Sequence, residues 1–500
     1  MNLTPFRLTA ALALAVWAAP SFAAPEADAE QVRATTVKLI NQLVEQGVLT
    51  REKADALLAE MNKPSAAPAP VRVPYMPEFM RKELKDEVQL DLAAQAAREG
   101  WAKPGAVPAW VRGLAWEGDV RTRYQFDNFA ADNAPALSVN DTNRNRAVAL
   151  ANTTDDRRRF RVRARTGLNA SIDENWAAGV RLTTGSTTDP LSSNQTLGTY
   201  GNRFTTAFDR AYIRYRYGSS FNAVAGRFGN PWFGTDLVWA NDLGFDGVAL
   251  QYTPSFTPAV RGFVTLAAMP IQEVELSTAD KWLYGVQVGA SQSGTARDIG
   301  AKIGLGYYRY TNMVGQLSPV NSTLNEFSAP QFAQKGNSYY NISSDPARPL
   351  LGLASDYRLI NLTGQLDFAA GEGKRAVLTG DYVRNVGFDR AAVSARVGVD
   401  VDPQIRGYQL RGAYGTAEVS KPHDWQAFLA YKRVERDAVL DAFTDSDFHL
   451  GGTDAKGYIL GGSYGLGKNT AVSLRYFSGD AISGPPLAID VIQLDLSVHF

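Results

Sequence analysis

The chain has 500 residues, equal numbers of basic and acidic side chains (51 each) and no cysteine. The balanced charge gives no reason to expect a nucleic-acid partner, and the absence of cysteine excludes disulfides, thiolate zinc sites and a cysteine nucleophile. With 44 Gly, 21 Tyr and 23 Phe but only three His, the composition is more typical of β-rich binding or membrane proteins than of enzymes.

Residues 1–23 are predicted to form a secretory signal peptide. Arg7 supplies the positive charge, residues 8–19 are apolar, and small residues at Ser21 and Ala23 form a cleavage signature. The apolar stretch is too short to cross a bilayer as an anchor. We therefore expect cleavage after Ala23, or one residue later, and export of the chain.

Residues 24–63 are predicted to be helical. Apolar residues recur near helical spacing, Gly47 interrupts them, and Thr50 is suited to cap a second helix. Because a narrow apolar stripe cannot be buried alone, the segment could pair with copies of itself in a coiled coil or fold back as a monomeric hairpin. Residues 64–110 follow as a linker rich in Pro and Ala and an amphipathic helix over residues 78–98.

From residue 111 onward, helical periodicity gives way to period-two alternation in segments of roughly ten residues separated by turn residues. We predict strands over 116–127, 157–172, 175–185, 208–217, 221–228, 245–254, 259–268, 282–292, 298–310, 357–369, 375–385, 406–416, 424–434, 455–465, 469–479 and 489–500. Short connections alternate with mostly long ones, as do the periplasmic turns and outer loops of a bacterial outer-membrane barrel. The expected fold class over 111–500 is therefore an all-β transmembrane antiparallel barrel of about 16 strands, preceded by a short α-helical periplasmic segment.

The last strand shows two different faces. Its even-numbered residues from Ile492 to Phe500 are apolar, whereas its odd-numbered residues from Gln493 to His499 are polar. A closed barrel hides both edges of its sheet, which is the only way strands can sit in lipid. The apolar face is then expected to contact lipid and the polar face to line the lumen.

Two stretches resemble the family of Gram-negative outer-membrane proteins called "putative porin". One runs from Gly226 to Gly247 and contains Gly-Arg-Phe-Gly-Asn-Pro-Trp, and the other runs from Asp441 to Tyr458. The resemblance implies a porin-like barrel without catalytic residues or cofactors, and it names no solute. The terminal Phe500 is similar to the signal that the barrel-assembly machinery reads. Expected partners are thus outer-membrane lipid, that machinery and further copies of the chain, as in a trimer.

Arginines occupy alternate positions from Arg157 to Arg165. Period two places them on one face of a strand, and each would cost roughly 2–4 kcal/mol facing lipid at mid-membrane, so they are expected to face water. Two interpretations stay open: an anion-selecting wall, or a charge-balanced lining paired with loop carboxylates. With neighbouring strands, the predicted pore-lining arginines are Arg121, Arg123, Arg159, Arg161, Arg163, Arg165, Arg181, Arg210, Arg214, Arg216 and Arg227.

The connection 229–244 is unusually aromatic and contains several acids. It could fold into the barrel and narrow it, with its acids opposite the basic wall, or pack as a cap on the rim or at a subunit contact. The constriction candidates are Trp232, Asp236, Trp239, Asp242 and Asp246.

A third candidate site is the carboxylate cluster Asp445, Asp447 and Asp454, with two glycines between the second and third aspartates. Such a cluster could hold Ca²⁺, but its spacing departs from the EF-hand loop and no Glu completes it. A solvated outer loop is therefore the preferred interpretation, and no metal is expected.

The function expected from these features is passive diffusion of small hydrophilic, anionic solutes through an arginine-lined pore. Two alternatives remain. One is a structural outer-membrane protein tethered through its helical N-terminus, and the other is a barrel enzyme such as a phospholipase. No Ser motif accompanies His423, His449 or His499, so enzymatic activity is not expected.

Overall fold

The computed structural model describes residues 113–136, 150–293, 299–371 and 373–500. All of them belong to one compact unit, Glu99–Phe500. The predicted signal peptide, the helical segment 24–63, and the linker and helix within 64–110 lie outside the described residues. Among the described helices, none has the length and apolar character needed to cross a membrane.

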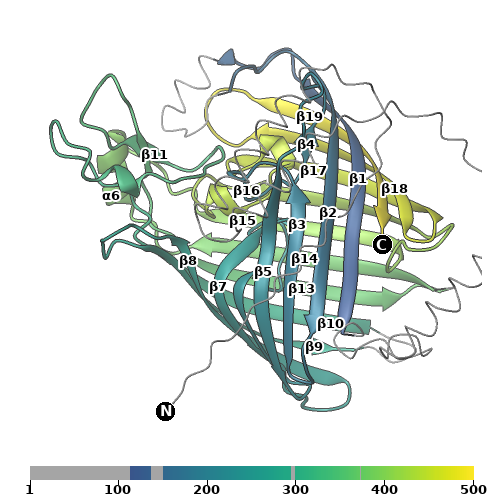
Figure 1. The fold of residues 1–500 in the computed structure, drawn as a ribbon. Helices are drawn as coiled ribbons and strands as arrows, with labels where there is room; N and C mark the ends of the chain where they lie inside the picture. The colour runs from purple at the N-terminus through teal and green to yellow at the C-terminus, as the bar shows by residue number, and fades with distance from the viewer. Residues whose placement is uncertain (1–112, 137–149, 294–298, 372) are drawn as a thin grey trace, which may run out of the picture. The chain divides into compact units, whose positions relative to one another are not determined.

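Sixteen antiparallel strands form one closed barrel, as the alternation predicted (Figure 1). Each strand pairs with the next along the chain, and the last pairs with the first. The strands are β1 (Leu114–Phe129), β2 (Arg157–Ser171), β3 (Trp176–Thr184), β5 (Thr206–Tyr217), β6 (Phe221–Gly229), β7 (Gly244–Tyr252), β8 (Val260–Gln272), β9 (Lys281–Gln292), β10 (Ile299–Thr311), β13 (Arg358–Ala369), β14 (Lys374–Asn385), β15 (Arg406–Thr416), β16 (Trp425–Val434), β17 (Ala455–Gly467), β18 (Thr470–Ala481) and β19 (Ala488–His499).

Short elements decorate the connections. The two-residue strand β4 (Gln195–Thr196) pairs with β2, and β11 (Tyr339–Asn341) pairs with β12 (Leu351–Leu353). The helices are α6 (Arg390–Val397) and the 3-10 turns η1 (Glu326–Ser328), η2 (Asp441–Phe443) and η3 (Phe448–Leu450). In Figure 1, α6 and β11 stand beyond one end of the barrel.

The barrel closes through β1 and β19, in register from Asp119 opposite His499 to Phe129 opposite Ile489. Phe500 extends this pairing, because its backbone exchanges hydrogen bonds of 3.0 and 2.8 Å with Gly118. A Cβ at Gly118 would lie 2.5 Å from the Phe500 ring, so only glycine leaves room for the terminal aromatic side chain.

The two faces of the strands differ as the alternation predicted. In β19, Ile492, Leu494 and Leu496 are exposed on the outside, whereas Gln493 and Asp495 are buried on the inside. The connections also alternate in length: those at one end of the barrel are short, and those at the other end, such as 312–357 and 435–454, are mostly long.

The interior at the long-connection end contains a hydrophobic core made by three connections, 230–243, 312–357 and 435–454. The prediction of a solvated loop at 435–454 is therefore wrong: Val439 and Asp441 are completely buried. The physical reason is the apolar run of residues 438–440, which packs into the core instead of facing solvent.

Candidate functional site

The inward faces of β1 and β2 bring six arginines together. Cross-strand register places Arg123 opposite Arg161 and Arg121 opposite Arg163. Two arginines directly opposite each other repel, so this arrangement needs nearby carboxylates. We call this set the basic ladder: Arg121, Arg123, Arg159, Arg161, Arg163 and Arg165.

Two aspartates form ion pairs with Arg163 and Arg165 of the basic ladder. Asp119 accepts hydrogen bonds from Arg163 at 2.8 Å and from Arg165 at 2.6 Å. Asp242, near the end of the aromatic connection 230–243, lies 3.1 Å from Arg165 and 3.5 Å from Arg163. Asp242 therefore pairs with the basic ladder directly and does not lie across the lumen from it, which is where the acids of this connection were predicted to lie.

Arg123 of the basic ladder forms ion pairs with a neighbouring strand and with an inward connection. Arg123, whose side chain is 1% exposed, lies 2.7 Å from Asp495 of β19 and 3.3 Å from Asp447 of the inward connection 435–454. Asp447 also lies 3.3 Å from Arg475 of β18. Burial alone would raise the pKa of Asp447, but the two guanidinium groups bring it below its usual value.

The remaining predicted arginines divide into paired and unpaired groups. Arg159 pairs with Asp127, Arg181 with Asp209, and Arg227 with Asp246. No ion pair joins Arg161, Arg210, Arg214 or Arg216 to any carboxylate of the described residues. The Nε atoms of Arg121, Arg159, Arg161, Arg210 and Arg214 are buried without a hydrogen-bond acceptor.

The unpaired members have other contacts. Arg161 donates to Gln125 and Ser192 at 3.4 and 3.2 Å, and the Arg214 guanidinium lies 5.0 Å from the centre of the Tyr212 ring. Arg216 is exposed near the end of β5, before the short turn. Arg157 is exposed at the start of β2, after the long connection that precedes this strand. The sequence therefore places these arginines on the right face but does not show which of them lack a carboxylate.

The aromatic connection 230–243 crosses the inside of the barrel. The N–H of Phe233 donates to Gln287 of β9 at 2.8 Å, and the Thr235 hydroxyl donates to Asp381 of β14 at 2.6 Å. Trp239 is 1% exposed, and its ring centre lies 5.0 Å from that of Tyr308 on β10. Trp232 is also buried against Tyr308. The connection thus reaches strands far from β6 and β7, where it begins and ends.

The two inward connections are joined to each other and to one buried lysine. Lys432 of β16 is 1% exposed and lies 3.4 Å from Asp236 and 3.2 Å from Asp445. The N–H of Ala240 donates to the carbonyl of Phe443 at 2.8 Å. Lys432 was not among the residues predicted from the sequence, although its position on the polar face of a strand beside two acid-containing connections is a detectable signal.

A second pair of carboxylates ties 435–454 to the connection 312–357. Tyr357 donates to Asp437 at 2.9 Å, and Tyr339 donates to Asp441 at 2.9 and 3.0 Å. Burial raises the pKa of both carboxyls, that of Asp441 to about 7.

The three carboxylates considered for Ca²⁺ each have a cationic partner. Asp445 pairs with Lys432, Asp447 with Arg123 and Arg475, and Asp454 with Arg436 at 3.2 Å. Within the part of the chain that the structure describes, no group of three or more His, Cys, Asp or Glu residues is arranged to hold a metal ion.

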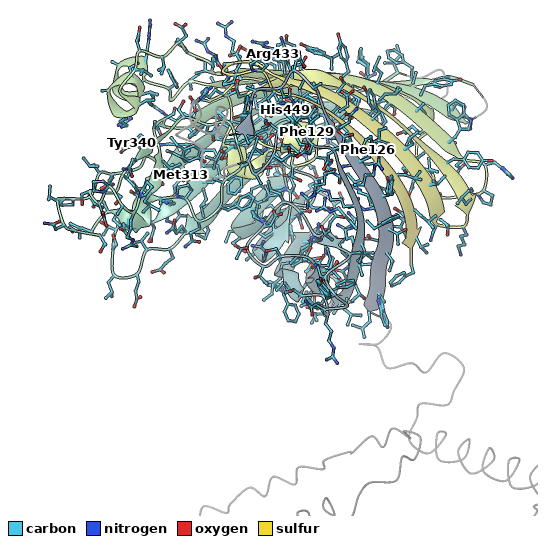
Figure 2. The ribbon with its side chains drawn as sticks, turned by 90° about the horizontal axis from the view of Figure 1, so that it is seen from above. Phe126, Phe129, Met313, Tyr340, Arg433 and His449 are labelled. Carbon is cyan, nitrogen blue, oxygen red and sulfur yellow. The ribbon has the colours of Figure 1, made fainter. Side chains whose placement is uncertain are left out.

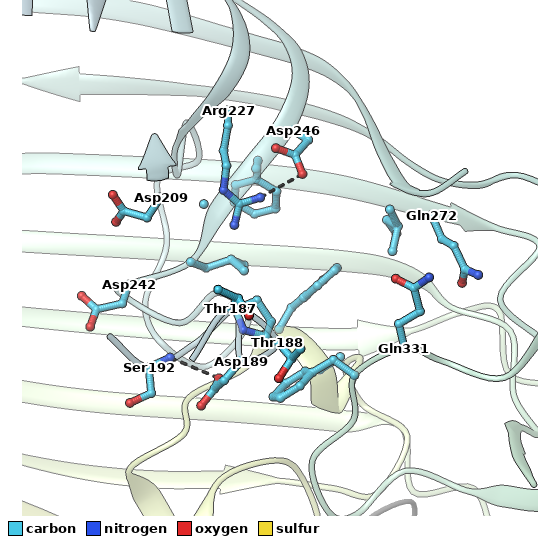
Figure 3. Close-up of a pocket in the computed structure, with 18 of the residues that line it drawn as sticks. Thr187, Thr188, Asp189, Ser192, Asp209, Arg227, Asp242, Asp246, Gln272 and Gln331 are labelled. Carbon is cyan, nitrogen blue, oxygen red and sulfur yellow. Dashed lines mark hydrogen bonds and ion pairs between the residues drawn. The ribbon is translucent and has the colours of Figure 1, made fainter. Parts of the chain in front are cut away.

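A cavity of about 710 Å³ lies inside the barrel beside β3 and β5–β9 (Figure 3). One wall is apolar and includes Phe245, Met269 and Leu283. The other is polar and includes Thr187, Thr188, Asp189, Ser192, Asp209, Arg227, Asp242 and Asp246. Of the constriction candidates, Asp242 and Asp246 therefore line this cavity, while both tryptophans lie in the core and Asp236 binds Lys432.

Residues 33–500 match the sequence model of the family described as "putative porin". Among solved structures, the chain is similar to OprB of Pseudomonas putida at high pH (12% identity, 78% of this chain and 95% of that chain, TM-score 0.46). It is also similar to the outer membrane channel DcaP of Acinetobacter baumannii (13% identity, 77% and 97%, TM-score 0.42) and to a loop-deletion mutant of the outer membrane protein OmpT of Vibrio cholerae (12% identity, 77% and 99%, TM-score 0.42). No curated protein matches the chain.

Proposed function

The chain belongs to the putative porin family, and we propose that it lets small hydrophilic solutes diffuse passively across the outer membrane, with a preference for anions. The observation that carries the preference is an excess of arginines over carboxylates on the wall formed by β18, β19, β1 and β2. This wall contains Arg475 and the six arginines of the basic ladder, against Asp119, Asp127, Asp242, Asp447 and Asp495.

The cavity adjoins this wall through Asp242, which lines the cavity and pairs with Arg163 and Arg165 of the basic ladder. The inward connections pack against β9, β10, β14 and β16 and reach β1, β2 and β18 through Asp242 and Asp447, and the cavity borders β3 and β5–β9. Arg181 and Arg210 lie opposite each other on β3 and β5, with Asp209 as the single carboxylate paired there. A low-dielectric wall focuses the field of unpaired charges, so they act more strongly than on an open surface.

Selectivity would then come from pore width and fixed charge and would need no chemical step. The connection 230–243 would narrow the pore, as the constriction candidates imply. The ion preference should fade with rising salt, because the Debye length falls from about 10 Å at 0.1 M to about 3 Å at 1 M.

The test is single-channel conductance in planar bilayers, with the reversal potential measured across a salt gradient. Replacing the unpaired arginines Arg161, Arg210 and Arg214 together by Gln should shift the reversal potential toward cations. The matched control removes three outward-facing arginines, Arg309, Arg384 and Arg406, and should leave the reversal potential unchanged. A folded inward variant with unchanged ion preference would show that these arginines are structural lining only.

A structural membrane protein is the second candidate, and the buried core inside the barrel favours it. Such a protein would insert into the bilayer without producing conductance steps. The same bilayer recording therefore separates the two candidates, since a folded barrel with no conductance at any voltage would leave only the structural role.

The proposed function also implies an orientation of the barrel, an assembly signal and an oligomeric state. We infer that the long connections face outward, so tags inserted in 311–356 should be reachable on intact cells and tags in 370–374 should not. Phe500 would serve as the assembly signal, and its deletion should lower the amount of folded barrel without altering secretion. Association into trimers can be measured by native mass spectrometry of the purified protein.

A further inference from the structure

Six cationic side chains lie on the outer surface of the barrel, at the end of the strands that carries the long connections. They come from six consecutive strands of the barrel, β10 and β13–β17, and each is exposed or half-buried on the face that carries the apolar side chains. We call this set the basic belt: Arg309, Arg358, Arg384, Arg406, Arg433 and Lys456. In Figure 2, Arg433 lies at the edge of the barrel, whereas His449 lies inside it.

The register of the sheet sets these cations against one another. Arg309 pairs with Arg358, Arg384 with Arg406, and Arg433 with Lys456, each directly across from its partner. Like charges directly opposite on one face of a sheet are destabilising. Three such pairs in succession indicate that the belt is built to meet negative charge from outside the chain.

The chain supplies few carboxylates to the basic belt. Asp356 lies 3.2 Å from Arg358, and Glu435 lies 3.4 Å from Arg433. The other four cations form no ion pair with any carboxylate in the described ranges. The next strand contributes Asp480 opposite Lys456, but it too forms no ion pair with a described residue.

A row of tyrosines lies next to the basic belt on the same outward face, toward the middle of the strands. Tyr307, Tyr382, Tyr408, Tyr431 and Tyr458 each stand two residues from a belt cation. Tyr431 contacts both neighbouring rings, with centres 6.0 Å from Tyr408 and 5.0 Å from Tyr458. Aromatic girdles mark the edge of the apolar band in outer-membrane barrels. Two residues of strand put the belt about 6.6 Å beyond this row, at the level of lipid headgroups.

The outer surface also offers a place for a lipid chain. A shallow hollow of about 450 Å³ runs over β7–β10 and is lined by apolar side chains such as Leu250, Leu266 and Val286. The small residue Ala268 leaves room for the hollow. Tyr307 and Arg309 also line it, so an apolar groove leads to a cation of the belt.

We propose that the basic belt binds the phosphate groups of phosphorylated lipid in the outer leaflet, with a lipid chain in the groove below Arg309. Arginine suits phosphate because its planar fork donates two parallel hydrogen bonds. A row of cations that follows the aromatic girdle around six strands matches a lipid surface, since lipid headgroups lie at one level all along it. The proposal requires the barrel to span the membrane with its long connections outward, but it does not require the barrel to conduct.

The test compares the full-length protein with a variant carrying Arg384→Gln and Arg406→Gln. Both are purified in a zwitterionic detergent and mixed with diphosphorylated lipid A, with the dephosphorylated lipid or with inorganic phosphate. Retained lipid is counted by native mass spectrometry, and stability is read as the temperature at which the heat-modifiable gel band is lost. The control variant carries Lys374→Gln and Lys468→Gln at the short-turn end.

Diphosphorylated lipid should be retained by the original protein and by the control, and it should raise their unfolding temperature. The belt variant should lose at least half of both effects, while its conductance and ion preference stay unchanged. Equal lipid retention by the belt variant would overturn the proposal, as would a change confined to oligomeric state or a full effect of inorganic phosphate alone. The single variants Arg384→Gln and Arg406→Gln, each expected to lose part of the effect, keep the test decisive if the double variant does not fold.

Discussion

Two rows of cations lie on opposite faces of one barrel, and they differ in how many carboxylates of the chain pair with them. Inside, on β1 and β2, most arginines of the basic ladder lie within 4 Å of an aspartate supplied by another strand or by an inward connection. Outside, on β10–β17, the cations of the basic belt face one another, and only two have a carboxylate partner among the described residues.

The difference follows from the counter-charges that are available to each row. An arginine or lysine buried in the interior must find its counter-charge within the chain, because an uncompensated buried charge is strongly destabilising. A cation at the outer rim can be satisfied by water or by lipid headgroups. Paired cations therefore indicate structural support, and unpaired ones indicate a site that an external anion can occupy.

The largest expected effect comes from removing an inward cation that holds two carboxylates. Lys432→Met leaves Asp236 and Asp445 without their shared ammonium group inside the barrel. We expect a loss of about 3–5 kcal/mol in the free energy of unfolding, because one partner of a buried ion pair is gone. The temperature at which the heat-modifiable gel band disappears measures this loss.

Lys456→Gln is the matched control, since it removes a lysine of the outer belt that binds no described carboxylate. Its unfolding temperature in zwitterionic detergent should stay close to that of the original protein. Equal destabilisation by both substitutions would contradict the difference between the two rows.

The strands and their faces could be predicted from the sequence because period-two alternation depends only on local chain geometry. All sixteen strands were placed correctly, and the alternation in β19 assigned its lipid-facing and inward residues. The interior of the long connections could not be predicted. The Asp-rich composition of 441–454 indicated a solvated loop, whereas Asp445 and Asp447 pair with cations from β1, β16 and β18 inside the barrel.

The ion pairs of the basic ladder also could not be predicted from the sequence. Asp242 and Arg165 are 77 positions apart and meet only because the connection 230–243 folds inward and returns to β2. The alternating arginines of β2 predicted only that these side chains share one face of the strand. Which arginines remain unpaired depends on contacts with three different connections, and no local pattern encodes them.

The second prediction changes the balance of the inward row by one charge. Asp242→Asn removes a carboxylate from Arg163 and Arg165, which then share Asp119. The reversal potential in a salt gradient should shift toward anions at low salt, and the shift should shrink at high salt because of screening. Asp480→Asn on the outward face is the control, and a similar shift there would mean that the ladder does not set the ion preference.

The third prediction concerns the pH dependence of the inward connection 435–454. The pKa of Asp441 is raised to about 7 by burial, so between the ordinary pKa of Asp and this pH the folded protein holds a proton that the unfolded chain has already lost. The stabilising contribution of this site is complete below the ordinary pKa of Asp and is lost as pH rises through about 7. Thermal stability should therefore fall over that range.

Asp441→Asn should flatten this part of the stability profile, because the amide still accepts a hydrogen bond from Tyr339 but does not titrate. The difference between the two profiles isolates Asp441 from Asp437, whose pKa is also raised by burial. If the two proteins keep the same pH profile, another group controls the attachment of this connection.

The smallest expected effect has the opposite sign from the first and uses the outer row. Arg384 and Arg406 lie directly opposite each other, and neither guanidinium forms an ion pair with a described carboxylate, so replacing both by Gln removes a repulsion. In zwitterionic detergent the variant should be slightly more stable, by about 0.5 kcal/mol. In phosphorylated lipid the same variant should be the less stable protein, because the original pair then binds phosphate. A reversal of sign between the two media, measured as unfolding temperature, is the result that a purely structural arginine pair cannot produce.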